Sequence, residues 1–225
     1  MIFFDIDNTL INYDASEEIS IIILYKEMSG VLLDKKQVEY WHMISQKYFD
    51  EYLKGIMSFD EQGIIRIKDM SKNCNLGIDE SSAMNWFDKY QKILSCNWML
   101  FDDVLDTLKF LKNKRLGIIS NGNAKQQSQK LLCTNIDSYF EIKVFSGEVG
   151  YAKPSHCIFK NAISQANEDA ENVVYVGDNV RTDIMPCMQL GIKSILIDRN
   201  NKYNSVENRI FNLKDVSVFL EKWQL

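Results

Sequence analysis

The spacing of apolar residues changes along the chain and divides it into two parts. Residues 2–6 form a short apolar run that is typical of a buried strand. From residue 12 to about residue 96, apolar residues recur with the spacing of amphipathic helices. From residue 101 onward, short apolar runs alternate with stretches of helical spacing. The pattern predicts a core of residues 1–11 and 97–225 and an all-helical cap of residues 12–96.

Polar residues in the cap region stand where helix N-caps are expected, and most have an acidic or amide partner three residues later. They are Asp14 with Glu17, Asp34 with Gln37, Ser58 with Glu61, and Asp79. Four packed helices are therefore expected. The aromatic residues of this region also recur at helical spacing, which favours packing in the cap's own core over stacking on a nucleobase.

The second part of the chain predicts alternating helices and strands. The helices are expected at about 102–113, 123–133, 155–167, 182–190 and 212–223, and the strands at 115–119, 142–145, 172–176 and 192–197. Such alternation indicates a parallel sheet with helices on both faces, which the strand at residues 2–6 joins. The expected fold class is α/β, a Rossmann-like core with an inserted helical cap. The Asp102–Asp103 pair is interpreted as a helix start.

Composition narrows the possible partners. The net charge is -5, and the longest basic run is residues 112–115, which argues against nucleic acid as a partner. The longest apolar stretch, residues 19–25, is too short to cross a bilayer, and no secretory signal is visible. Five cysteines without a Cys-x-x-Cys pair indicate reduced thiols and a cytoplasmic protein. The spacing of His42 and His156 favours structural over metal-binding roles. No feature determines the oligomeric state.

Four carboxylates follow two of the expected strands. Asp5 and Asp7 come after the first strand, and Asp178 and Asp183 come after the strand at 172–176. Because the carboxyl ends of parallel strands meet at one edge of a sheet, we expect these residues to converge. Clustered carboxylates repel one another, so such a cluster calls for a cation. Oxygen ligands of this kind suit Mg²⁺.

Two further segments carry groups that could bind phosphate. Ser120, Asn121 and Gly122 lie between an apolar run and a helical stretch, and offer a hydroxyl and backbone amides. Lys153 precedes a proline in a loop before another helix. Taken alone, the first segment is more often a helix N-cap, and a lysine before proline is usually on the surface. Together with the carboxylates, they suit phosphoryl transfer.

The complete set of motifs resembles the haloacid dehalogenase-like hydrolase superfamily. The segment from Asp5 to Leu10 matches its first motif, Ser120 its second, Lys153 its third, and Gly177–Asp178 with Asp183 its fourth. A helical insert after the first motif is similar to the subfamily with a cap at that point. Residues 120–131 and 146–154 resemble the branch of pyrimidine nucleotidases and N-acylneuraminate phosphatases.

The resemblance implies catalytic roles for three residues. Asp5 would be the nucleophile that forms an aspartyl-phosphate. Asp7 would be the general acid/base. Lys153 would neutralise Asp5 and the phosphate. The dehalogenases of the superfamily lack an acid at the position of Asp7, because a halide leaving group needs no proton, so Asp7 favours a phosphate ester.

The resemblance also implies binding roles. Ser120, Asn121 and Lys153 would hold the phosphoryl oxygens. The ligands of Mg²⁺ would be Asp5, Asp178 and the backbone carbonyl of Asp7. Supporting residues would be Thr9, Gly122 and Asp183. The chain departs from the family at Cys187 and Leu190, where smaller residues are usual, and at Pro186 in the opening of that helix, and we expect local repacking there.

The function expected from these features is a Mg²⁺-dependent phosphatase. Its substrate would be a small phosphorylated metabolite, with a nucleoside monophosphate or a sugar phosphate as the first candidates. Two alternatives stay open. A phosphomutase would keep the same aspartate pair and return the phosphoryl group to the substrate. A non-catalytic module would only bind phosphorylated ligands.

Overall fold

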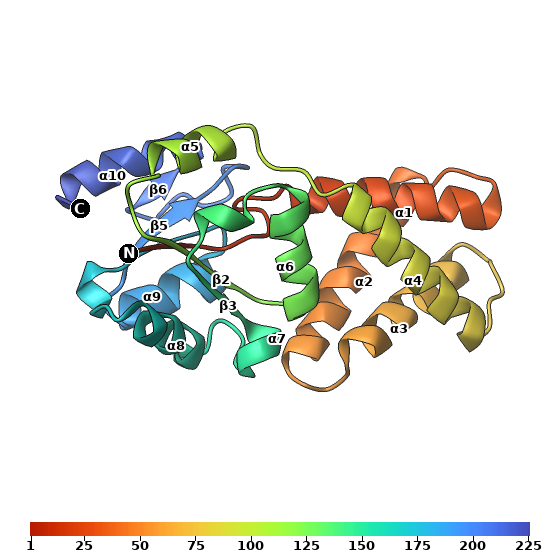
Figure 1. The fold of residues 1–225 in the computed structure, drawn as a ribbon. Helices are drawn as coiled ribbons and strands as arrows, with labels where there is room; N and C mark the ends of the chain where they lie inside the picture. Colours follow the sequence, from red (N-terminus) through yellow and green to blue (C-terminus); the bar gives the residue numbers. More distant parts are fainter. The chain divides into compact units, whose positions relative to one another are not determined.

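Six parallel strands form one sheet in the computed structural model, which describes residues 1–225 (Figure 1). Their order across the sheet is β3-β2-β1-β4-β5-β6. The strands are β1 (Ile2–Phe4), β2 (Leu116–Ser120), β3 (Ile142–Phe145), β4 (Val174–Gly177), β5 (Lys193–Ile197) and β6 (Arg209–Ile210). The α/β fold class is confirmed, and β6 is a strand that the apolar pattern did not predict, because only two residues pair.

The sheet and its helices form the first of two units, Met1–Asn12 with Met99–Leu225. Its helices are α5 (Val104–Phe110), α6 (Ala124–Cys133), α7 (Ser146–Val149), α8 (His156–Ala166), α9 (Met185–Gln189) and α10 (Val216–Lys222), with a π-helical turn at Val180–Ile184. Successive strand residues point to opposite faces. Accordingly, Ile2 and Phe4 belong to one apolar cluster and Phe3 to the other. Both clusters are buried, so helices cover both faces.

The helix expected at 182–190 is divided in two, with the π-helical turn before α9. Pro186 lies in the first turn of α9, where proline is tolerated. Cys187 is buried in the same apolar cluster as Phe3, and Leu190 packs against it. The larger side chains at these positions are thus accommodated within the core of the unit.

Asp103 stands at the start of α5, but its side chain does not cap the helix. The carboxylate is buried and accepts hydrogen bonds from Arg199 at 2.8 and 3.0 Å and from the backbone N–H of Leu213 at 2.7 Å. Arg199 also donates to the carbonyl of Thr9 at 2.8 Å. The interpretation of Asp103 as a helix start is therefore incomplete, since its carboxylate ties the loop after β1 to the C-terminal segment.

The second unit, Tyr13–Trp98, consists of four helices. They are α1 (Tyr13–Ser29), α2 (Lys35–Leu53), α3 (Phe59–Asn73) and α4 (Glu80–Cys96). The capping boxes predicted at Asp34 and Ser58 are both present, and Asp79 caps α4 through the N–H of Ser82. None of the protein's helices has the length and hydropathy of a membrane-spanning segment.

The capping box predicted for Asp14 and Glu17 is wrong. The helix begins one residue earlier, at Tyr13, and Glu17 lies inside it with 4% of its surface exposed. Glu17 accepts a hydrogen bond from Arg66 at 2.7 Å and contacts Nδ1 of His42 at 3.2 Å. Arg66 donates to Ser45 at 2.6 Å and lies over the ring of Trp41. An ion pair thus occupies the interior of the helical unit, where a buried charge requires a partner.

Aromatic residues surround this ion pair. Trp41 and Tyr90 are fully buried and meet edge to face with ring centroids 5.1 Å apart. Phe87 and Tyr48 are also buried. The interpretation of these four as core residues is confirmed, whereas Tyr40, Phe49, Tyr52 and Trp86 are only partly buried.

We predict that His42 makes the stability of the protein depend on pH. Its hydrogen bond to Glu17 raises the pKa of His42, while burial lowers it to a lesser extent. Because the pKa of His42 is higher in the folded state than its value of about 6.5 in the unfolded state, protonated His42 stabilises the fold fully below about pH 6.5. This stabilisation is lost as the pH rises through the raised pKa of the folded state.

The measurement is the thermal midpoint between about pH 5.5 and pH 8.5. As the pH rises through this window, the thermal midpoint of the wild type should decrease more than that of His42→Gln. His156→Gln, at the only other histidine, is the matched control and should follow the wild type. Parallel profiles for the wild type and His42→Gln would contradict the prediction.

Candidate active site

The chain reverses its direction of winding at β1, which lies between β2 and β4. Open parallel sheets bind ligands at such a switch point, beyond the carboxyl ends of the strands. Asp5 follows β1, Ser120 ends β2, and Asp178 follows β4. The N–H of Asp5 donates to the carbonyl of Val176 at 2.9 Å, which extends the pairing of β1 and β4 into the loops. The register of the strands thus places these residues at one edge.

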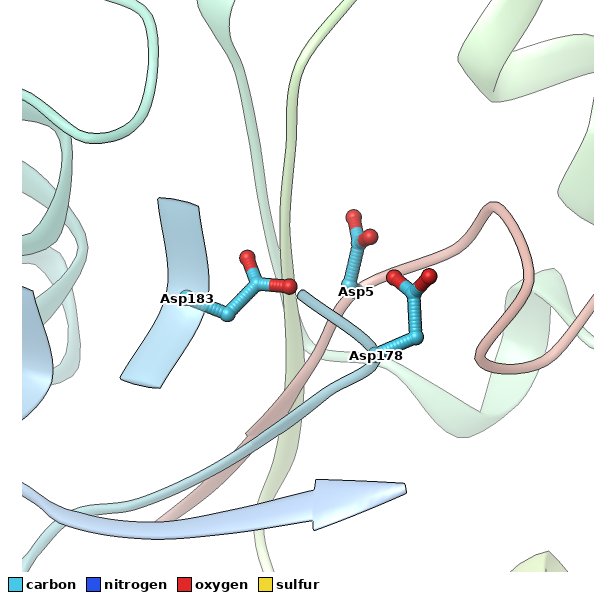
Figure 2. A group of neighbouring side chains, drawn as sticks. All are labelled: Asp5, Asp178 and Asp183. Carbon is cyan, nitrogen blue, oxygen red and sulfur yellow. The ribbon is translucent and has the colours of Figure 1, made fainter. Parts of the chain in front are cut away.

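Three carboxylates meet at this edge. One oxygen from each of Asp5, Asp178 and Asp183 lies within 4.8 Å of the others (Figure 2). Asp5 and Asp178 come from the loops after β1 and β4, whereas Asp183 lies in the π-helical turn. Asp183 is fully buried, and 7% of Asp5 is exposed. Burial, followed by the charges of Asp5 and Asp183, raises the pKa of Asp178 to about 8. Burial also raises the pKa of Asp183, although Lys153 opposes this effect.

Lys153 supplies the positive charge within this cluster. Its ammonium lies 2.9 Å from Oδ1 of Asp5 and 2.7 Å from Oδ1 of Asp183, and only 4% of the residue is exposed. Burial lowers the pKa of Lys153, but Asp183 and Asp5 raise it by more, so the net pKa is raised and the amine stays charged. With all three carboxylates ionised, one ammonium leaves two negative charges unbalanced.

The cluster fits a divalent cation with a preference for oxygen ligands, such as Mg²⁺. Both oxygens of Asp183 already accept hydrogen bonds, Oδ1 from Lys153 and Oδ2 from the N–H of Asn179. Asp5 and Asp178 are therefore the better candidates for ligands. The structure thus places Asp183 as a support for Lys153.

The carboxylate of Asp7 lies outside this cluster. It pairs with the ammonium of Lys130 at 2.6 and 2.8 Å and accepts a hydrogen bond from Gln127 at 3.1 Å. Its side chain remains 27% exposed. Any part that Asp7 has in metal binding falls to its backbone carbonyl, because its side chain is held by α6.

Asn121 joins the second motif to the third. Its side chain donates to the carbonyl of Lys153 at 3.0 Å and accepts from the N–H of Lys153 at 2.7 Å. This reciprocal pair fixes the loop that carries the ammonium. The side chain of Asn121 is thereby engaged with the backbone, which leaves the hydroxyl of Ser120 and backbone amides as the groups available to an anion at the end of β2.

The two other supporting residues hold backbone positions. Gly122 has a φ of 131°, which disfavours a side chain, and its N–H donates to Ser146 at 2.9 Å. Thr9 is fully buried, and its carbonyl accepts from Arg199. Both stabilise the loops around the site, and the buried hydroxyl of Thr9 makes no hydrogen bond to the carboxylates.

Three further residues belong to the site, and the motifs assigned none of them a role: Tyr175, and Gln127 and Lys130 within the segment 120–131 that carries the branch resemblance. The hydroxyl of Tyr175 accepts from Lys153 at 2.9 Å and donates to the carbonyl of Ile119 at 3.0 Å. Burial raises the pKa of Tyr175 well above its usual value, so it remains a neutral phenol. In the sequence, Tyr175 could have been noticed as a residue with a polar hydroxyl inside an otherwise apolar strand. Gln127 and Lys130 could have been noticed as two polar residues at helical spacing soon after the second motif.

Comparisons with known proteins agree with this geometry. The family model for haloacid dehalogenase-like hydrolases matches residues 2–197. Pyrimidine 5'-nucleotidase YjjG of Escherichia coli is 25% identical over 203 residues, which cover 89% of this chain and 87% of the relative. N-acylneuraminate-9-phosphatase of Mus musculus is 28% identical over 207 residues, which cover 86% of this chain and 79% of the relative. The resemblance to the branch of these two enzymes is confirmed.

A shorter match and a solved structure complete the comparison. Glyceraldehyde 3-phosphate phosphatase of Pyrococcus abyssi is 40% identical over 81 residues, which cover 36% of this chain and only 34% of that protein. The crystal structure of the HAD hydrolase YfnB of Bacillus subtilis, bound to magnesium, superimposes with a TM-score of 0.82. It covers 97% of each chain at 22% identity, so this likeness establishes the fold alone.

We predict that the affinity for Mg²⁺ rises with pH. At neutral pH a cation at Asp178 competes with a proton, because the pKa of that carboxyl is about 8. Below this pKa, the affinity should increase by up to about tenfold per pH unit, and above it the affinity should level off. Calorimetric titration with MgCl₂ between about pH 6 and pH 9 measures the effect.

The variant Asp178→Asn should bind Mg²⁺ weakly and without this slope. Asp102→Asn, at an exposed position, is the matched control and should bind as the wild type does. Affinity in Asp178→Asn equal to that of the wild type, or a flat profile in the wild type, would rule out Asp178 as the ligand that controls binding.

Proposed function

The chain belongs to the haloacid dehalogenase-like hydrolase family, and on this premise we propose that it is a Mg²⁺-dependent phosphatase for a small phosphorylated metabolite. The observation that carries the proposal is the buried ion pair of Asp5 and Lys153, 2.9 Å apart, within the acidic cluster at the switch point of the sheet. A carboxylate oxygen can act as a nucleophile toward phosphorus. The same ammonium balances part of the charge of an approaching phosphate.

The proposed reaction has two steps. An oxygen of Asp5 attacks phosphorus, the bond from phosphorus to the leaving oxygen breaks, and the proton of Asp7 passes to that oxygen. Water then attacks the phosphorus of the aspartyl-phosphate. Its proton passes to Asp7, and the bond between phosphorus and Asp5 breaks. Both residues return to their starting states, and phosphate and an alcohol are the products.

Lys153 and Ser120 hold the phosphoryl group in this proposal. Lys153 reaches Asp5 directly, and the hydroxyl of Ser120 stands at the end of the neighbouring strand. Asn121 acts on the phosphate through its backbone, since its side chain holds the loop of Lys153. Asp5, Asp178 and the carbonyl of Asp7 would hold Mg²⁺, which when bound balances the negative charge of the cluster and of the phosphate.

The presence of Asp7 favours phosphate esters over organic halides as substrates. An alkoxide leaving group needs a proton, and a halide does not. The named relatives act on a pyrimidine nucleotide, an N-acylneuraminate phosphate and a triose phosphate. Nucleoside monophosphates and sugar phosphates are accordingly the first substrates proposed here. The five cysteines are free, which supports a reducing compartment such as the cytoplasm.

The test is phosphate release by the wild type and by Asp5→Asn with Mg²⁺, across nucleotides, sugar phosphates and an aryl phosphate. The wild type should release phosphate. Asp5→Asn should lose on the order of 10³-fold or more in turnover, because an amide is a poor nucleophile. Asp102→Asn should keep wild-type activity, and the circular dichroism of all three proteins should agree.

Two results would contradict the proposal. Transfer of the phosphoryl group between positions of a substrate, without release, would indicate a phosphomutase. Binding of the phosphorylated compounds without any turnover would indicate a non-catalytic module.

A further inference from the structure

Helix α6 presents two buried polar side chains to Asp7. Gln127 and Lys130 are three residues apart and so lie on the same face of the helix. Each is 1% exposed. Asn123 caps the helix through the N–H of Gln126, and buried Leu131 anchors it in the apolar core. The position of both polar groups is therefore set by a fixed helix.

Lys130 contacts both oxygens of Asp7, at 2.6 Å from Oδ1 and 2.8 Å from Oδ2. Burying an ammonium is costly unless a carboxylate accompanies it. Two contacts from one donor oppose rotation of the carboxylate about its Cβ–Cγ bond. The ion pair thus restrains the orientation of the Asp7 side chain.

Gln127 connects Asp7 to the end of β2. Its amide nitrogen lies 3.1 Å from Oδ2 of Asp7, 2.8 Å from the hydroxyl oxygen of Ser120 and 3.0 Å from the carbonyl of Asn121. Its own carbonyl oxygen is buried and has no hydrogen-bond partner. An unpaired buried oxygen is destabilising. An apolar side chain would avoid that loss, which indicates that the amide at this position serves the site.

We propose that Lys130 and Gln127 are positioning residues that fix the carboxylate of Asp7 for proton transfer. The inference deepens the proposed function and depends on it. Oδ2 accepts from both residues, which fills its two lone-pair positions, whereas Oδ1 accepts from Lys130 alone. The remaining lone pair on Oδ1 is the one that carries the transferred proton. Gln127 binds Oδ2 of the same carboxylate and the hydroxyl of Ser120, so it holds Asp7 at a fixed distance from the group proposed to bind the phosphate.

The test compares leaving groups. Alkyl phosphates need the proton of Asp7, whereas activated aryl phosphates need it little. We measure kcat/KM, which reports the step in which the leaving group departs, for alkyl phosphates and for aryl phosphates of graded leaving-group pKa. Lys130→Met and Gln127→Met should each lose about ten- to a hundredfold on alkyl phosphates and less than about threefold on the most activated aryl phosphate. Lys130→Arg, which keeps the charge, should recover part of the loss.

A double-mutant cycle with Asp7→Asn separates positioning from general damage. If Lys130 acts through Asp7, then adding Lys130→Met to Asp7→Asn should lower kcat/KM by less than about threefold further. Lys125→Met, at an exposed position of the same helix, is the matched control and should behave as the wild type. The thermal midpoint of each variant identifies losses caused by unfolding.

Equal losses on all leaving groups, or additive losses in the Asp7→Asn background, would overturn the inference. A crystal structure of Lys130→Met or Gln127→Met with the carboxylate of Asp7 unmoved would also overturn it. These outcomes, obtained with an active wild type and an inactive Asp5→Asn, leave the proposed phosphatase function intact. A wild type that releases no phosphate from any substrate would overturn both.

Discussion

One buried ammonium among three carboxylates is the constraint on which the site depends. Lys153 pairs with Asp5 and Asp183, while Asp178 stands within the same cluster with its pKa raised to about 8. The protein supplies too little positive charge to balance this arrangement. A fold that keeps such a cluster benefits from any ligand that brings positive charge to Asp5 and Asp178. The same imbalance makes the site a poor place for a bare phosphate and a good one for a phosphate accompanied by a divalent cation.

The parallel sheet makes this concentration of charge possible by fixing where each loop starts. The pairing of β1 with β2 and β4 brings three loops to one edge, and short hydrogen bonds then hold the loops to one another. Asn121 holds the backbone of Lys153, and Tyr175 holds its ammonium. Asp183, which lies in the π-helical turn, accepts another hydrogen bond from that ammonium. The catalytic candidates are thus placed by buried partners.

The sequence could predict features that depend on local pattern, and failed where a residue's role is set by distant partners. Asp5 and Asp178 could be expected to converge because each follows an apolar run that had to be a parallel strand. The caps at Asp34, Ser58 and Asp79 depend on residues three positions away. Glu17 and Asp103 resemble caps in the same way, but Arg66 and Arg199 engage them from far along the chain. The contacts of Gln127, Lys130 and Tyr175 could not be predicted, because each of these residues binds one that only the tertiary structure brings near.

Anomalous diffraction can locate the divalent cation that we propose completes the charge of the carboxylate cluster. Crystals grown with Mn²⁺ in place of Mg²⁺ reveal the cation through its anomalous scattering, independently of any assumption about the reaction. We expect one strong peak with oxygens of Asp5 and Asp178 among its ligands and with Lys153 still paired to Asp183. A cluster without a peak at saturating Mn²⁺, or a peak bound only by other residues, would contradict it.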